Sequence, residues 1–185
     1  RVVETHDGDP VEIAVDVAGA DGGDQSIVLT LRGPRLVSLQ AWQNKKTYEL
    51  AELVAAQVKT EVMHLPAGTQ VVVGVDSIGM GRGVYENLAD VQRVPSVSGV
   101  DVSEQALDPT RFHRLRDQIY WELREAFVET RTISLRLVDP RDPDRIVLDD
   151  ELIGQLTSIK WAEVGGKIKI QGKGSSSGIP NCPPL

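Results

Sequence analysis

Two aspartates each close an apolar segment of the sequence, and this shared context is the clearest sign of chemistry in the chain. Asp16 lies in the alternating segment 11–17, which predicts a strand with one buried face. Asp76 closes the nearly continuous apolar segment 70–76, which predicts a strand covered on both faces. In open α/β sheets the working site lies at the carboxyl ends of the strands. If the two strands are neighbours, about 4.8 Å apart, their carboxylates repel each other unless a cation lies between them, and Mg2+ or Mn2+ suits such oxygen ligands.

Each aspartate also has a simpler interpretation, because glycines follow both and an aspartate in that place often caps a turn. Asp24, in the glycine-rich turn 19–24, is a candidate for a further ligand or for a hydrogen-bond partner of the ligands, with turn formation as the alternative. The glycine-rich segment 79–83 lacks the GxGxxG spacing of dinucleotide-binding loops, and the chain contains no P-loop motif. We therefore expect no nicotinamide cofactor.

The first hundred residues predict a mixed sheet in an α/β fold. Three strands joined by short turns predict an antiparallel meander, and the later apolar strands, separated by helices, predict parallel pairing. The expected elements are strands at 11–17, 26–31, 36–40, 70–76 and 97–102, a helix at 47–59, and a short helix on which Val84, Leu88 and Val91 face inward.

The second half predicts further helices and a final β-hairpin around Gly165-Gly166. The segment 108–110 has capping residues for a long helix, and Asp149 is expected to cap another. The expected elements are a long helix with a stripe of Phe112, Leu115, Ile119, Leu123 and Phe127, a strand at 133–137, a loop at 139–144, a helix with Leu152, Ile153 and Leu156, and hairpin strands at 159–163 and 167–170.

The composition is that of a globular domain with an acidic balance. The chain has 185 residues and a net charge of −7, from which we expect one domain over residues 1–172 and an irregular tail over 173–185. The acidity argues against a module that holds nucleic acid by charge alone, but it suits an enzyme that gathers carboxylates around metal ions. A single cysteine, Cys182, excludes an internal disulfide and favours a reducing, cytosolic setting, and no segment is apolar enough to span a bilayer.

Two groups of cations are candidates for contacts with a phosphate backbone. Lys167, Lys169 and Lys173 lie on or just after the last hairpin strand. A second group lies near the start of the long helix, where ordinary solvated charge is the alternative interpretation. Its members are Arg111, Arg114 and Arg116.

Taken in order, several segments of the sequence resemble the C-terminal nuclease domain of the large subunit of tailed-phage terminases. The segment 15–24 resembles the family's first acidic strand, followed by Ala, Gly and a second Asp, and the segment 73–84 resembles its second acidic strand and glycine turn. Further similar segments are 112–123, 150–156 and 167–173. The similarity covers nearly the whole chain, and the order of the segments makes it more specific than any one of them.

This resemblance implies a ribonuclease H-like fold and a metal-dependent endonuclease that cuts concatemeric double-stranded viral DNA. Asp16, Asp76 and a third ligand would hold two Mg2+ or Mn2+ ions roughly 4 Å apart for phosphodiester hydrolysis. The resemblance also implies an ATPase motor domain on the same full-length chain, a portal and a small terminase subunit as partners, and the cytoplasm of a bacterial host as the location of a phage or prophage protein.

The end of the sequence departs from the family's pattern. The family has a Ser-Pro-Asp motif whose Asp is the third metal ligand, whereas Asn181 takes that place here. The two prolines that follow, Pro183 and Pro184, would interrupt the helix that the family motif opens. An amide oxygen ligates a metal without contributing charge. One rival function is therefore a catalytically impaired ribonuclease H-like module that acts only in DNA or partner binding. Another is a phosphotransferase or ATPase of the wider superfamily, although such enzymes usually need a duplicated domain.

Overall fold

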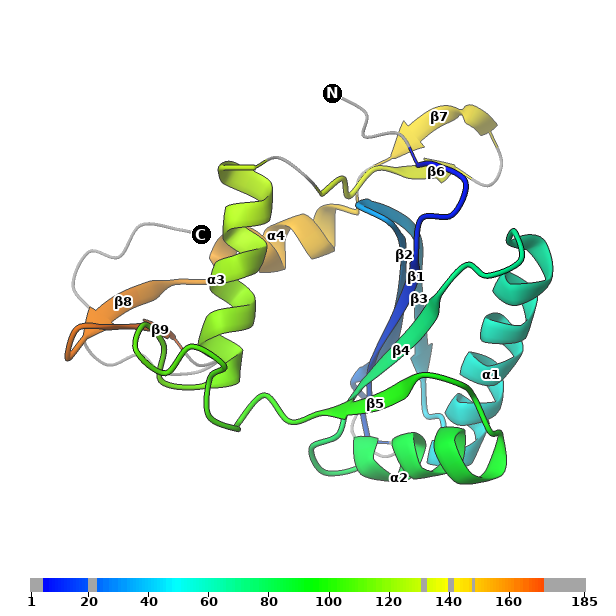
Figure 1. Ribbon diagram of the computed structural model, residues 1–185, viewed down its shortest axis with the longest axis horizontal. Coiled ribbons are helices and arrows are strands. Elements are labelled where there is room, and N and C mark those ends of the chain that lie inside the picture. The colour runs from blue at the N-terminus through cyan, green and yellow to red at the C-terminus, as the bar shows by residue number, and fades with distance from the viewer. Residues whose placement is uncertain (1–4, 20–22, 131–132, 140–141, 148, 172–185) are drawn as a thin grey trace.

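A computed structural model describes residues 5–19, 23–130, 133–139, 142–147 and 149–171 of the chain. Its centre is a five-stranded sheet with the strand order β3-β2-β1-β4-β5 (Figure 1). The first three strands form the expected antiparallel meander, and β4 and β5 extend it in parallel. The strands are β1 (Val11–Asp16), β2 (Gln25–Arg32), β3 (Arg35–Gln43), β4 (Val71–Asp76) and β5 (Val97–Val100). This mixed sheet confirms the fold class predicted from the sequence.

One face of the sheet is covered by α1 (Thr47–His64), α2 (Gly81–Glu86) and the short π-helical turn η1 (Asn87–Val91) (Figure 1). Alternate residues of β1 and β4 point into this layer, and residues of α1 at helical spacing meet them. The resulting apolar core includes Val11, Ile13, Val15, Val28, Leu50, Val54, Val58, Val73, Val75, Val84 and Leu88.

The expectation that Val91 faces inward is wrong, because its side chain is 66% exposed. The backbone amide of Gln92 donates to the carbonyl of Asn87, a bond between residues five apart. The wider turn of a π-helix changes the angle between successive side chains, so the spacing from Leu88 to Val91 no longer returns to the same face.

The remaining elements form a second group, most of which lies on the other side of the sheet (Figure 1). There α3 (Leu115–Val128) stands beside the hairpin of β8 (Trp161–Val164) and β9 (Lys167–Ile170), with α4 (Asp150–Ser158) nearby, whereas β6 (Leu137–Asp139) and β7 (Asp142–Val147) lie above the end of the sheet in this view. Ser134 links this group to the sheet, because its amide donates to Pro34 over 2.8 Å and its carbonyl accepts from Leu36 over 2.9 Å.

Two predictions made from short sequence motifs are confirmed in this second group, a helix cap and a hairpin turn. The side chain of Asp149 accepts a hydrogen bond from the amide of Leu152 over 2.8 Å and so caps α4. Gly165 and Gly166 have φ angles of 59° and 76°, the left-handed conformation that a tight hairpin turn requires.

The expected start of the long helix is wrong. Asp108 accepts from Thr110 within a local turn, and α3 begins only at Leu115, where Asp117 accepts from the amide of Arg114 over 3.0 Å. Phe112 therefore precedes the helix and is buried against β9, where the amide of Ile168 donates to the carbonyl of Arg111. The expected stripe is also incomplete, because Ile119 is exposed.

The loop expected at 139–144 and the strand expected at 133–137 also need correction. β7 begins at Asp142 and pairs with β6, which begins at Leu137, while Ser134 makes only an isolated bridge to Arg35. β6 and β7 are consecutive strands, so pairing within a local hairpin overrides the prolines that suggested a loop. The expected boundary between the domain and its tail, at residues 172 and 173, lies outside the described residues. Within the described ranges, the structure has no helix of the length and apolar character needed to cross a membrane.

Candidate active site

The structure brings Asp16 and Asp76 together on neighbouring parallel strands. β1 and β4 pair from Val11 with Val71 to Val15 with Val75, and each aspartate is the next residue of its strand. Val15 and Val75 point into the core, so the alternation of the strands places both carboxylates on the opposite face, where Asp16 is exposed and Asp76 is half-buried. Two acidic side chains thus lie side by side at the carboxyl edge of the sheet.

The backbone that follows each aspartate is held in place. The amide of Ala18 donates to the hydroxyl of the buried Ser26 over 3.0 Å, and the amide of Ser77 donates to the carbonyl of Val100 over 3.0 Å. Oδ1 of Asp76 accepts from the amide of Ile78 over 3.1 Å. Turn capping, the simpler interpretation of such a residue, therefore does occur at Asp76, and it orients the carboxylate.

The glycine turn after β4 permits a close approach between backbones. A Cβ placed on Gly81 would lie 1.7 Å from the carbonyl oxygen of Asp76, so only glycine fits there. A Cβ on Gly83 would make ordinary contact with Thr47 at 3.5 Å. The packing of α2 against β4 therefore requires a glycine at 81, whereas position 83, beside the start of α1, has room for a Cβ.

Two further aspartates lie at the same edge of the sheet. Asp24 is exposed and directly precedes β2. Asp101 directly follows β5 and was missed in the sequence, because the expected strand ran past it to residue 102. Its carboxylate accepts from the hydroxyl and the amide of Ser103 over 2.5 and 2.8 Å, which holds the pKa of Asp101 below its ordinary value. An aspartate directly after a third parallel strand is the signal that identifies it.

The donor chemistry of the pair suits a hard divalent ion, since two adjacent carboxylates provide anionic oxygens. Among the described residues, however, no three acidic, histidine or cysteine side chains lie close enough together to hold a metal. Asn181, expected in the place of the third ligand, lies outside the described residues. Within the described ranges, Asp16 and Asp76 are therefore the two candidate ligands.

The candidate DNA contacts Lys167 and Lys169 lie on β9, and the hairpin to which they belong lies beyond α3 as seen from the sheet (Figure 1). Lys169 is exposed and Lys167 is half-buried. The buried carboxylate of Asp117 accepts from the amide of Ile170 over 2.8 Å and so ties the hairpin to α3. Lys173 lies outside the described residues. The structure thus does not bring Lys167 or Lys169 to the carboxylate pair.

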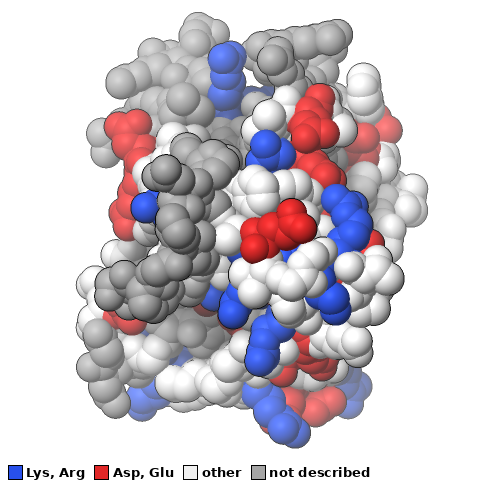
Figure 2. All heavy atoms as spheres, turned by 90° about the vertical axis from the view of Figure 1, so that its left-hand side faces the viewer, with Lys and Arg blue, Asp and Glu red and all other residues white. Residues whose placement is uncertain are grey.

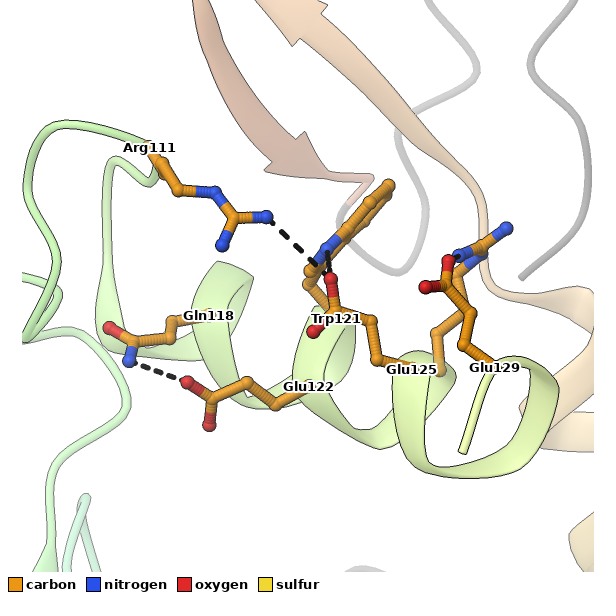
Figure 3. A network of polar contacts seen from close by, with 7 residues as sticks. Arg111, Gln118, Trp121, Glu122, Glu125 and Glu129 are labelled. Atoms are coloured by element: carbon orange, nitrogen blue, oxygen red, sulfur yellow. Dashed lines mark hydrogen bonds and ion pairs between the residues drawn. The ribbon is translucent and has the colours of Figure 1, made fainter. Parts of the chain in front are cut away.

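The three arginines around the start of α3 make local contacts. Arg111 pairs with Glu125 at 3.6 Å, and Trp121 donates to the same carboxylate over 2.7 Å (Figure 3). Arg114 donates to the carbonyl of Ser103 over 2.9 Å, and Arg116 to that of Gln171 over 3.4 Å. Figure 2 shows positive and negative side chains interspersed on this side of the molecule. The arrangement favours the interpretation of ordinary surface charge for this group.

Comparisons with known proteins find similar structures but no similar sequences. No family model and no curated protein matches the chain. The nuclease domain of the large terminase subunit gp2 of bacterial virus Sf6 matches with a TM-score of 0.60 and 17% identity over 91% of this chain and 80% of that one. A mutant of that domain, solved with manganese and beta-thujaplicinol, matches with a TM-score of 0.61 and 17% identity over 89% of this chain and 78% of that one.

A second terminase gives the same result. The large terminase nuclease from thermophilic phage G20c matches with a TM-score of 0.55 and 13% identity over 90% of this chain and 74% of that one. At such low identity the likeness concerns the fold. The chain has the fold of the nuclease domains of phage large terminase subunits, as the sequence resemblance predicted.

Proposed function

We propose that this chain is the metal-dependent endonuclease domain of a viral DNA-packaging terminase and cuts concatemeric double-stranded DNA. The observation that carries the proposal is the pair Asp16 and Asp76, adjacent on parallel strands at the carboxyl edge of the sheet and on the face away from the core. The fold shared with terminase nuclease domains supports it.

In this proposal Asp16 and Asp76 hold Mg2+ or Mn2+, with Asn181 in the place of a third ligand and Asp24 as an accessory group. When bound, a pair of such ions activates water and stabilises the leaving oxygen of the phosphodiester. The residues of the chain orient these ligands: the amide of Ile78 donates to one oxygen of Asp76, and the hydroxyl of Ser26 accepts from the backbone after Asp16.

Lys167, Lys169 and Lys173 remain candidate contacts to DNA. An ATPase motor domain on the full-length chain, a portal and a small terminase subunit are the partners, in the cytoplasm of a bacterial host.

The test is cleavage of supercoiled plasmid DNA by this chain with Mn2+. We expect nicked and linear products, which disappear with EDTA and with Asp76→Ala. Asp90→Ala is the matched control, because Asp90 is also exposed but lies on η1, in the layer on the other face of the sheet. Cleavage that survives Asp76→Ala and Asp16→Ala would place the site elsewhere.

A second candidate function, a module that binds DNA or a partner without cutting, is favoured by Asn181, which lacks the charge of the family's third carboxylate. The same assay separates the two. If the parent chain does not cut but Asn181→Asp with a restored family motif does, the natural chain is a disarmed nuclease domain. Titration with Mn2+ by calorimetry then measures directly whether Asn181→Asp tightens metal binding.

A further inference from the structure

Three cations lie at the starts of α1 and α2, at the edge of the sheet where the strands of the carboxylate pair end. We call Lys45, Lys46 and Arg82 the edge cations. They come from two connections far apart in the sequence, from β3 to α1 and from β4 to α2. None of them was singled out in the sequence, because no local pattern places them together.

The sheet topology brings the first connection to the carboxyl edge. β2 is antiparallel to both β1 and β3, so β3 runs in the direction of β1 and ends at the same edge as Asp16. The side chain of Gln43, the last residue of β3, donates to the carbonyl of Gly23 in the turn after β1 over 3.3 Å. Lys45 and Lys46 therefore lie on the same edge of the sheet as the carboxylate pair.

The packing of α2 against α1 joins the second connection to the first. Thr47 follows Lys46 and lies 3.5 Å from the position of a Cβ on Gly83, which follows Arg82. The neighbouring Gly81 is in backbone contact with Asp76. A series of contacts therefore connects Asp76 to α2, where Arg82 lies, and α2 to the start of α1, which Lys45 and Lys46 precede.

Arg82 and Lys46 are exposed, and the contacts described for them are weak. The side chain of Arg82 is 76% exposed, and its pair with Glu86 over 2.7 Å is also exposed, so that the pair contributes little and Arg82 exchanges easily to another anion. Lys46 is exposed and Lys45 half-buried. Nζ of Lys46 lies 5.9 Å from the centre of the Tyr48 ring, a contact that leaves its hydrogen-bond donors available.

Large apolar side chains are exposed beside these cations. Tyr48, Ile78 and Met80 are 47%, 48% and 45% exposed. Ile78 and Met80 lie in the turn between Asp76 and Arg82, and Met80 is 3.6 Å from the Cβ position of Gly19 in the segment after Asp16. Exposed apolar groups mixed with cations suit a surface that contacts the sugars and phosphates of a nucleic acid.

We propose that the edge cations bind the phosphate backbone of duplex DNA on the α1–α2 side of the carboxylate pair and so position the phosphate to be cut. This inference rests on the proposed nuclease function. DNA is the occupant that the charges favour, because the chain as a whole is acidic and a duplex that reaches Asp16 and Asp76 needs cations close to them. Contacts with the backbone set the register of the duplex without reading its sequence.

The test is binding of a fluorescent 30-base-pair duplex, followed by anisotropy in EDTA at several salt concentrations, with the triple variant Lys45→Ala, Lys46→Ala, Arg82→Ala. Loss of three phosphate contacts should reduce the slope of log affinity against log salt by roughly 2 to 3. The matched control removes three other exposed cations, by Lys59→Ala, Arg136→Ala and Lys160→Ala, and should keep the parent's slope. The exchange Lys45→Arg, Lys46→Arg, Arg82→Lys should restore the slope, which separates charge from folding.

Equal losses in the two triple variants, an unchanged slope in the edge variant, or no binding by the parent would each overturn the inference. Because the measurement uses no metal, it is independent of cutting. A parent that binds DNA through the edge cations but never cuts contradicts only the proposed nuclease function. A parent that cuts with Mn2+ while the edge variant cuts with the same KM contradicts only the role of the edge cations.

Discussion

The two faces of the central sheet differ although the same strands form both. On the face under α1 and α2, Val11, Ile13 and Val15 are at most 2% exposed. On the other face the alternating residues Glu12, Ala14 and Asp16 of the same strand are exposed. The buried face carries the apolar core, and the exposed face carries the candidate site.

Residues that stabilise the fold and residues that are available for chemistry therefore alternate along the same strand. Successive side chains of a strand point to opposite faces, so a carboxylate can replace or be replaced by another residue without entering the core. A slip of one residue in register would exchange the two faces completely. The carboxylate pair thus depends on the core for its position, whereas the core does not depend on the pair.

The largest effect is expected from removing either carboxylate. Asp16→Ala or Asp76→Ala should reduce plasmid cleavage by about 1000-fold or more, because a divalent ion supplies several kcal/mol of stabilisation to such reactions. The circular dichroism spectrum should remain that of the parent. Cleavage at the parent's rate by both variants would contradict the assignment of chemistry to the exposed face.

A second prediction compares neighbouring residues on opposite faces of β1. Ile13→Ala should lower the free energy of unfolding by about 2–5 kcal/mol, since it leaves a cavity in a packed core. Glu12→Ala, the matched control, should change it by less than about 0.5 kcal/mol. Urea denaturation measures both, and similar losses would mean that the exposed face also carries stability.

The third prediction concerns Gly81, the first residue of α2, which contacts the end of β4. Gly81→Ala should cost about 1–3 kcal/mol, because the new Cβ would lie 1.7 Å from the carbonyl oxygen of Asp76 and force the backbone to move. Cleavage should fall with it, as Asp76 is displaced. Gly154→Ala, on α4, is the control. Its new Cβ would meet no atom within 4 Å, so this change should stabilise the chain by up to about 1 kcal/mol.

The smallest effect is expected away from both faces, at the start of α4. Asp149→Ala should lower stability by about 1 kcal/mol through loss of the cap on Leu152, while Asp149→Asn should keep it. Thermal unfolding measures the difference between the two variants. A cleavage rate changed by Asp149→Ala in a fully folded protein would show that the site extends beyond the sheet.

The sequence by itself determined the features that depend on neighbouring residues. Alternation predicted β1, helical spacing predicted α1, and the paired glycines predicted the turn between β8 and β9. It also placed Asp16 and Asp76 at the ends of their strands. Such features are predictable because the backbone geometry of a strand, a helix or a tight turn imposes a short period or a particular residue type on the chain.

Only the tertiary structure decided what depends on pairing between distant segments. It placed β4 beside β1, which brings Asp16 and Asp76 together, and it drew Phe112 out of the expected helix to β9. It also gathered Lys45, Lys46 and Arg82 at one edge. Local periodicity contains no information about which strands become neighbours, because the free energy of that choice comes from burying their apolar faces together.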